Sequence, residues 1–217
     1  MQHTQVVASV YSSETRIWGN LIAATVPPRV SIDFVVGMPA VMAGDSLYWL
    51  VLITGGSLGI LQFNLGRQSL GFIPMPMKEV FAVADGIYFE ESLVIIQEGG
   101  CLGFLLLSGF SAQLWKRETN SDGLPSWVLG RTIALDKLLS INSEEAERPS
   151  ICGFAEDNNM VLLSTSTGIV TVLLESLQFK KLFESDHWYH YYPFEGVYTA
   201  DKGIGGGRDG AELLQNA

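Results

Sequence analysis

The chain has 217 residues, with 13 lysines and arginines against 23 aspartates and glutamates, which gives a formal net charge of −10. A nucleic-acid-binding protein needs a basic surface to displace phosphate counterions, so this charge argues against that class. Hydrophobic residues make up 47% of the chain and charged residues only 17%. That composition excludes an intrinsically disordered chain, because disorder goes with low hydrophobicity and high charge.

Short β-strands separated by turn residues recur along the chain. Glycines in the turns, such as Gly55 and Gly56, supply the positive φ that tight hairpins demand. One helix of one or two turns is predicted at 136–141, with Asp136 as its N-cap. Strands are predicted at residues 6–11, 15–18, 40–42, 47–53, 58–64, 70–73, 93–97, 101–107, 111–117, 151–155, 160–164, 169–174 and 178–183.

Three blocks of these strands follow the same order. Phe63, Trp115 and Val172 occupy the third strand of each block, 52 and 57 positions apart, and a period of about 50 residues is typical of a propeller blade of four antiparallel strands. We therefore predict an all-β protein of short antiparallel strands in blade-like repeats, a partial or small β-propeller. A β-sandwich is the alternative, because its strands are also short and closely spaced. The domain is expected to span 1–200, followed by a disordered tail at 201–217.

One segment matches a catalytic motif. GGSLG at 55–59 fits the G-x-S-x-G nucleophile elbow, in which a strand turns sharply into a helix and exposes the serine. The residues after Ser57 predict another strand, so we interpret the segment as a hairpin turn and expect no enzyme. A serine hydrolase using Ser57, with Asp136 or Asp157 and His187, is the rival from another functional class.

The sequence predicts no metal or cofactor. His187 and His190 lie three positions apart, but a zinc site needs three or four ligands and the remaining histidine is His3. GGGRDG at 205–210 fits the dinucleotide-binding pattern G-x-G-x-x-G, yet only seven residues follow it, too few for the helix that such a site requires.

Aromatic residues crowd into one segment near the C-terminus. Tyrosine and tryptophan combine a large apolar body with a polar tip, which suits binding hot spots. The other interpretation is that these rings pack on neighbouring strands. The turns at 55–57, 108–110 and 165–168 are further candidate contacts, since loops on a rigid scaffold carry recognition. The predicted partner-binding residues are His187, Trp188, Tyr189, Tyr191, Tyr192 and Phe194.

The sequence also indicates in which cellular compartment the protein is found. The most apolar stretches are far shorter than the roughly 18–20 residues that span a bilayer, and residues 1–5 do not resemble a signal peptide. Cys101 and Cys152 stand 51 positions apart without a CxxC pattern, which favours buried free thiols. We expect an intracellular protein, cytoplasmic or nuclear, without membrane contact.

Six segments also carry a family resemblance, and they run in consistent order through most of the chain. They resemble the C-terminal associated region of plant F-box proteins, which is often described as kelch-like or propeller-like. The segments are PAVMAGDSLYWL (39–50), ILQFNLGRQSLGFIPMP (60–76), GFLLLSGFSAQLWKRE (103–118), WVLGRTIALDKLL (127–139), GFAEDNNMVLLSTSTGIVTVLLESLQFKKL (153–182) and YPFEGVYTA (192–200).

The resemblance implies a function. In such proteins the F-box docks on the Skp1 adaptor of a cullin ubiquitin ligase, and the associated region recruits the protein to be ubiquitinated. This sequence shows no F-box, so a Skp1-type partner is expected only if an F-box lies upstream. We expect a protein-interaction module similar to the substrate-recognition part of the ligase adaptor, with a basic face on its partner because the chain is acidic. A truncated fragment without function is a further alternative.

Overall fold

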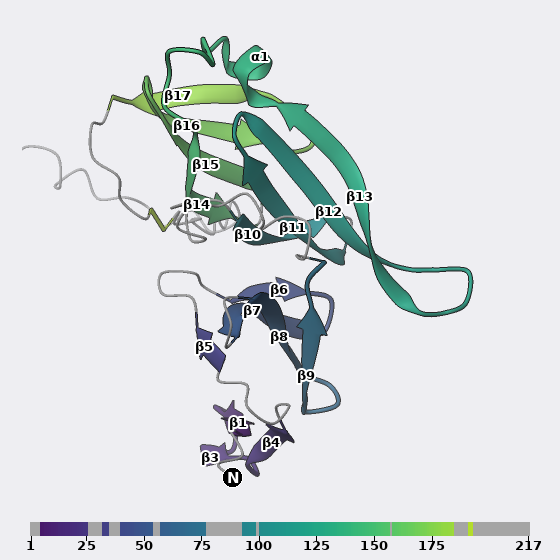
Figure 1. Cartoon of the computed structure of the whole chain (residues 1–217). Coiled ribbons are helices and arrows are strands. Elements are labelled where there is room, and N and C mark those ends of the chain that lie inside the picture. Colours follow the sequence, from purple (N-terminus) through teal and green to yellow (C-terminus); the bar gives the residue numbers. More distant parts are fainter. Residues whose placement is uncertain are drawn as a thin grey trace, which may run out of the picture.

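The computed structural model describes residues 5–25, 32–34, 40–53, 57–76, 93–98, 100–156, 158–184 and 191–192. Within these residues the protein is all-β (Figure 1): seventeen strands form antiparallel sheets, and one five-residue helix, α1, lies between the last two sheets in the chain. The predicted class of short antiparallel strands is confirmed.

The N-terminal hairpin comprises the first four strands. β1 pairs with β4, and β2 pairs with β3, both antiparallel, so the chain folds back once at residues 13–16. Between the two pairs the Gly19 amide donates to the Val10 carbonyl at 2.7 Å, which keeps the hairpin continuous. The strands are β1 (Gln5–Ala8), β2 (Tyr11–Ser12), β3 (Ile17–Trp18) and β4 (Ile22–Thr25).

The first sheet holds the next five strands. β5 and β6 both pair with β7, β5 beside the end of β7 and β6 beside its start, so together they form one interrupted edge strand. β7, β8 and β9 then pair in sequence order. The strands are β5 (Ile32–Phe34), β6 (Val41–Ala43), β7 (Ser46–Ile53), β8 (Ser57–Asn64) and β9 (Ser69–Pro74).

The second and third sheets are four-stranded meanders in which each strand pairs with its successor. The second sheet comprises β10 (Leu93–Glu98), β11 (Cys101–Ser108), β12 (Ser111–Thr119) and β13 (Pro125–Ala134). The third sheet comprises β14 (Ser150–Ala155), β15 (Met160–Thr165), β16 (Gly168–Leu173) and β17 (Phe179–Phe183). Both repeat the strand order of the first sheet.

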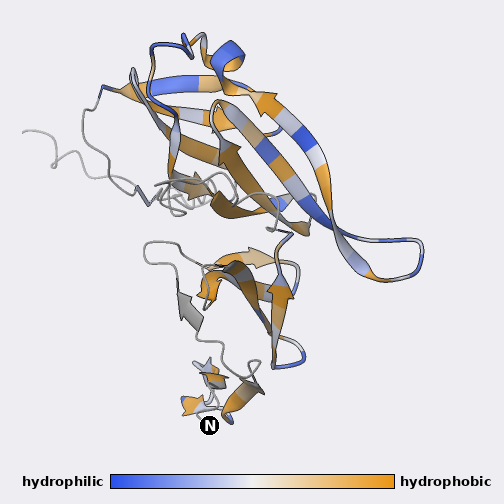
Figure 2. Ribbon diagram, viewed as in Figure 1, coloured by the Kyte–Doolittle hydropathy of each residue, from blue (hydrophilic) through white to orange (hydrophobic). Residues whose placement is uncertain are grey.

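Apolar side chains join the sheets face to face. One buried cluster lies between the first and second sheets, and a second lies between the second and third sheets, where α1 also contributes. Figure 2 shows this distribution as hydrophobic colouring along β7, β8, β10 and β11. Phe104, Ile60 and Leu105 are among the fully buried side chains. Burying each such side chain stabilises the fold by about 1.5–3 kcal/mol.

The first strands of the three sheets lie next to one another. β10 contacts β6 on one side and β14 on the other, as the inner strands of neighbouring propeller blades do. Among the described residues the arrangement is an open stack, because the N-terminal hairpin and the third sheet lie at its opposite ends (Figure 1). Three stacked sheets also differ from the two layers of the β-sandwich alternative.

The predicted repeat needs one adjustment. Phe63, Trp115 and Val172 lie in the third strands β8, β12 and β16, as expected. When positions are counted from the first residue of each strand, however, Leu61 is the residue equivalent to Trp115 and Val172. Leu61 lies 54 positions before Trp115, and Phe63 lies on the same face two residues further along β8.

The helix also differs from its prediction. α1 spans Leu135–Leu139, and its N-cap is Ala134, whose side chain makes no capping bond. Asp136 as the cap is therefore wrong: it lies in the first turn, where its charge favours the helix dipole. The physical reason is that Leu135 is buried and its amide donates to the Phe110 carbonyl at 2.8 Å, which fixes the start of the helix at the end of β13.

Candidate functional site

The outer face of the third sheet carries a small apolar cluster. Cys152, Leu162 and Ile169 come from β14, β15 and β16 and are buried there, and Met160 and Tyr191 pack against them. This face points away from the second sheet, because the alternate residues of the same strands belong to the cluster between the sheets. The third sheet therefore has a buried layer on both faces.

Tyr191 is held against the edge of this sheet by its backbone. Its amide donates to the Cys152 carbonyl at 2.6 Å. Gly153 makes the close approach possible, since a Cβ at this position would lie 2.5 Å from the Tyr191 carbonyl oxygen. Any side chain at residue 153 would push the chain at Tyr191 away from β14.

Three aromatic residues form what we call the C-terminal aromatic surface: Phe183, Tyr191 and Tyr192. The rings of Phe183 and Tyr191 meet edge to face, with centroids 5.8 Å apart. Phe183 is 44% exposed and Tyr192 is 64% exposed. The contact with the packed Tyr191 ring holds the Phe183 ring in place, so a partner that covers Phe183 pays less conformational entropy on binding.

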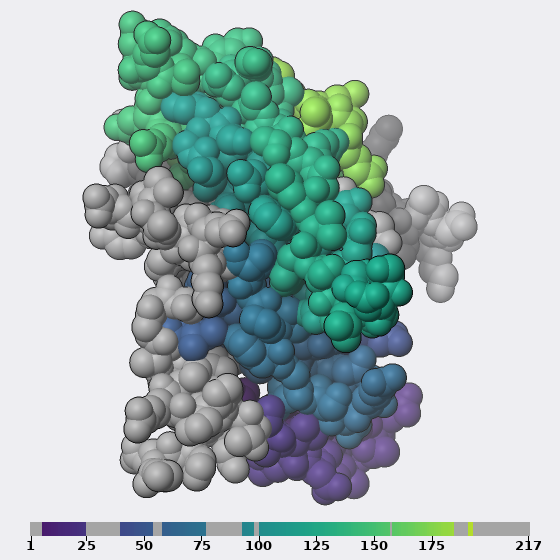
Figure 3. All heavy atoms as spheres, turned by 45° about the vertical axis from the view of Figure 1, so that its right-hand side comes forward, coloured from purple at the N-terminus to yellow at the C-terminus, as the bar shows by residue number. Residues whose placement is uncertain are grey.

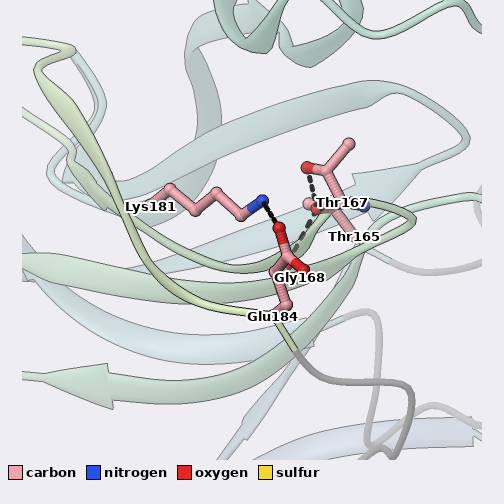
Figure 4. Close-up of polar contacts among 5 residues, drawn as sticks. All are labelled: Thr165, Thr167, Gly168, Lys181 and Glu184. Carbon is pink, nitrogen blue, oxygen red and sulfur yellow. Dashed lines mark hydrogen bonds and ion pairs between the residues drawn. The ribbon is translucent and has the colours of Figure 1, made fainter.

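The turn between β15 and β16 supports the same end of the third sheet (Figure 4). The Thr165 hydroxyl donates to the Gly168 carbonyl at 2.7 Å and lies 3.1 Å from the Thr167 hydroxyl. Gly168 has φ +116°, a conformation that side chains rarely adopt, and a Cβ there would overlap the Phe183 carbonyl. The position of Phe183 thus depends on a glycine fifteen residues earlier.

Of the predicted partner-binding residues, the structure describes two. Tyr191 packs against the third sheet, and the next residue, Tyr192, is exposed. His187, Trp188, Tyr189 and Phe194 lie outside the described residues. Phe183 was not predicted as a binding residue, because it stands at the end of a predicted strand and its contact with Tyr191 depends on tertiary structure, which no local pattern shows.

Two of the predicted contact turns occupy equivalent places in their sheets. Residues 108–110 join β11 to β12, and residues 165–168 join β15 to β16, so each lies between the second and third strands of its sheet. In the first sheet Ser57 is the first residue of β8, which follows β7; Gly55 and Gly56 lie outside the described residues. The turn at 165–168 is the one that adjoins the aromatic surface.

The nucleophile-elbow geometry is contradicted at Ser57. Ser57 is the first residue of a strand that pairs antiparallel with β7, whereas the elbow requires a turn from a strand into a helix. Asp136 lies on α1, and the other proposed partners, Asp157 and His187, lie outside the described residues. In the described part of the chain no three His, Cys, Asp or Glu side chains gather as a metal site would require.

Burial perturbs the Cys152 thiol beneath Tyr191. It raises the pKa of Cys152 to about 12, because the apolar cluster disfavours the thiolate, and a backbone hydrogen bond opposes this only in part. Thiolate is the reactive form of cysteine, so Cys152 is an inert packing residue. The prediction of buried free thiols is confirmed for Cys152 and wrong for Cys101, which is exposed at the start of β11.

Comparison with protein-family models, with characterised proteins and with solved structures gives no match for this chain. The resemblance to F-box-associated regions therefore stays a prediction. Among the described residues, no helix has the length and apolar character needed to cross a membrane.

Proposed function

We propose that this all-β protein is a protein-interaction module that binds a partner protein through the C-terminal aromatic surface. The observation that carries the proposal is the pair of exposed rings, Phe183 and Tyr192, beside the packed Tyr191 on a sheet that is buried on both faces. Aromatic residues held in place by a rigid scaffold are the groups that contribute most to protein–protein binding.

Charged groups near the C-terminal aromatic surface also support the recognition of a partner protein. Lys181 of β17 and Glu184, the residue after Phe183, form an ion pair at 3.0 Å (Figure 4). Charged groups at the rim of an apolar contact set orientation more than affinity. The net charge of −10 adds a long-range attraction toward a partner with a basic face.

The family resemblance extends the proposal to a cellular role. We infer the substrate-recognition part of an F-box-type ubiquitin ligase adaptor, acting in the cytoplasm or nucleus. The stack of blade-like sheets supports this role because it presents turns and strand ends from a rigid body. A Skp1-type adaptor would join through an F-box, and the ubiquitin-transfer chemistry would take place elsewhere in that assembly.

Co-purification with matched variants tests the binding function. The double variant Phe183→Ser/Tyr192→Ser is compared with Tyr11→Ser/Trp18→Ser, which alters the exposed ring pair of the N-terminal hairpin, whose centroids lie 5.3 Å apart. We expect the first variant to lose the proteins that co-purify with the unaltered chain, and the second to keep them. Equal recovery with both variants would refute the assignment of this surface.

The ligase role needs a separate test. Fusing an F-box that binds Skp1 to the N-terminus of this chain should lead to ubiquitination of the co-purified partner. The same fusion carrying Phe183→Ser/Tyr192→Ser should not. If the partner binds the fusion but is not ubiquitinated, the interaction module stands and the role in a ligase adaptor fails.

A further inference from the structure

The outer strand of the third sheet has an open edge. β17 pairs with β16 on one side, and all five of its residues are exposed, whereas β9 and β13, the outer strands of the other two sheets, are partly buried. β4 also lies against β9, and a bulge at Gly130 shifts the register of β13. In Figure 3 the yellow-green residues of this part of the chain lie at the surface of the molecule. Of the three outer strands, β17 is therefore the one best placed to accept a further strand.

The register of β17 shows which of its backbone groups face the open edge. The Leu173 amide donates to the Gln178 carbonyl at 2.9 Å, and the same register continues along β17 through Lys180. Because hydrogen-bonded and non-hydrogen-bonded pairs alternate along an antiparallel ladder, the backbone of Lys180 bonds to β16. The N–H and C=O groups of its two neighbours, Phe179 and Lys181, therefore point away from β16, toward the open edge.

A bulge in the same ladder brings two exposed side chains of β17 onto one face. Lys180 lies opposite Thr171 and Phe183 lies opposite Ile169, with a register shift between the two pairs. Ile169 belongs to the cluster on the outer face of the third sheet, and Thr171, two residues along β16, lies on the same face. Lys180 and Phe183 therefore share the outer face, which carries the C-terminal aromatic surface.

The charge of β17 differs from that of the whole chain. The strand reads FKKLF, with two lysines and no acidic residue, in a protein whose net charge is −10. Lys181 is paired with Glu184, but within the part of the chain that the structure describes no carboxylate pairs with Lys180. Opposite charges directly across a ladder stabilise it, and like charges destabilise it. The open edge therefore favours a strand that places a carboxylate opposite Lys180.

The same lysines disfavour pairing between two copies of this chain. Two β17 strands paired antiparallel about their centres would bring Lys180 and Lys181 of both copies together, and lysines on an open edge prevent such pairing in many proteins. The segment that fits the edge therefore comes from a different protein. Its carboxylate is a local match, and the long-range attraction of the acidic chain toward a basic partner face is unchanged.

We propose that the partner protein contributes an extended acidic segment, which pairs antiparallel with β17 as a fifth strand of the third sheet. This inference rests on the proposed function, because it names how the partner of the C-terminal aromatic surface binds. A carboxylate of the segment lies opposite Lys180, and an apolar side chain two residues earlier in the segment lies beside Phe183. Main-chain hydrogen bonds to Phe179 and Lys181 supply affinity, and the two side-chain contacts supply selectivity.

NMR titration with a defined peptide tests the pairing. The probe is acetyl-Thr-Phe-Thr-Glu-Thr-amide. We expect the amide protons of Phe179 and Lys181 to become protected from hydrogen exchange, and that of Lys180, which already bonds to β16, to stay unchanged. The same peptide with glutamine in place of glutamate should bind about two- to fivefold more weakly. N-methylation of the two threonines that flank the glutamate removes N–H donors and should weaken binding by about tenfold or more.

Two variants complete the titration. Lys180→Gln should bind the glutamate and glutamine peptides equally well. Lys137→Gln removes the same charge from an exposed position on α1 and should keep the preference for the glutamate peptide. Equal binding of the two peptides by the unaltered protein, full binding of the N-methylated peptide, or no protection at Phe179 and Lys181 would overturn the inference.

Co-purification separates this inference from the proposed function. Lys180→Glu should lose the proteins that Phe183→Ser/Tyr192→Ser loses, because it places a carboxylate opposite a carboxylate, and Lys137→Glu should keep them. If Phe183→Ser/Tyr192→Ser loses these proteins and Lys180→Glu keeps them, the aromatic surface stands as a binding surface and the strand pairing is wrong. If Phe183→Ser/Tyr192→Ser keeps them, the proposed function itself is wrong.

Discussion

The N-terminal hairpin and the outer face of the third sheet both expose aromatic side chains, but they differ in what lies beneath those side chains. Trp18 is 66% exposed and contacts the ring of Tyr11 on the short two-stranded pair of β2 and β3 at the end of this hairpin. Tyr192 is exposed to a similar degree, but it follows Tyr191, which is packed on a buried cluster. The exposure of aromatic rings alone therefore does not identify a recognition surface. What identifies it is the packing of the sheet beneath the rings.

The packing of the hairpin on the first sheet strengthens this contrast. Between β1 and the first sheet lies a partly open apolar pocket of about 220 Å³, lined by Val6, Val7, Trp49 and Phe63 among others. Missing contacts around a cavity reduce the dispersion energy that holds two elements together. We therefore expect the hairpin to be held less firmly than the third sheet.

A matched pair of isoleucines gives the largest expected difference. Ile169 is fully buried under the aromatic surface, and Ile17 in the hairpin is 65% exposed. Ile169→Ala should lower the free energy of unfolding by about 2–5 kcal/mol, and Ile17→Ala should change it by less than about 0.5 kcal/mol. Denaturant unfolding measures both. Similar losses would show that the hairpin belongs to the same packed core.

The packing of Tyr191 against β14 can be disrupted by adding a single methyl group at residue 153. Gly153→Ala should cost about 1–3 kcal/mol, because the new Cβ collides with the Tyr191 carbonyl. In a Cys101→Ser background the same change should also open Cys152 to a thiol reagent, since Tyr191 covers the cluster that contains it.

Gly71→Ala is the control for this variant. A Cβ at Gly71 would meet only the Gln62 side chain, at 3.6 Å, which is ordinary contact. Unchanged thiol labelling in Gly153→Ala would contradict the assigned position of Tyr191.

Alkaline pH should lower the free energy of unfolding through the buried Cys152 thiol of the third sheet. Burial raises the pKa of Cys152 to about 12, so between about pH 9 and that value the unfolded chain has lost a proton that the folded protein keeps. Stability therefore falls as the pH rises through this window, by up to about 1.4 kcal/mol per pH unit.

The slope of unfolding free energy against pH measures this effect. Cys152→Ala should reduce the slope, whereas Cys101→Ala, which changes an exposed thiol, serves as the control for general alkaline unfolding. An equal slope in the unaltered protein and in Cys152→Ala would contradict the buried position of the thiol.

The smallest effect is expected at the ion pair of Lys181 and Glu184. Both side chains are largely exposed, so water and salt screen their attraction. A double-mutant cycle with Lys181→Gln and Glu184→Gln should give a coupling of about 0.2–1 kcal/mol that disappears at high salt. A larger, salt-independent coupling would mean that the pair is part of the rigid base of the aromatic surface.

Much of the strand pattern could be predicted from the sequence, because turn glycines and β-branched runs mark hairpins locally. β13 was missed, since most of its residues are exposed and give no regular apolar alternation. The candidate site was only half predictable: a crowded aromatic segment indicated Tyr191 and Tyr192, but Phe183 joins them across the sheet.

Site-specific photo-crosslinking tests the central claim most directly, namely that the C-terminal aromatic surface binds a partner protein. The photoreactive residue p-benzoylphenylalanine replaces Tyr192 in one variant and Trp18 in another, two positions of similar exposure. We predict a defined crosslinked protein at position 192 that disappears when Phe183→Ser is added, and no such product at position 18. The same products at both positions, or none at position 192, would contradict the account.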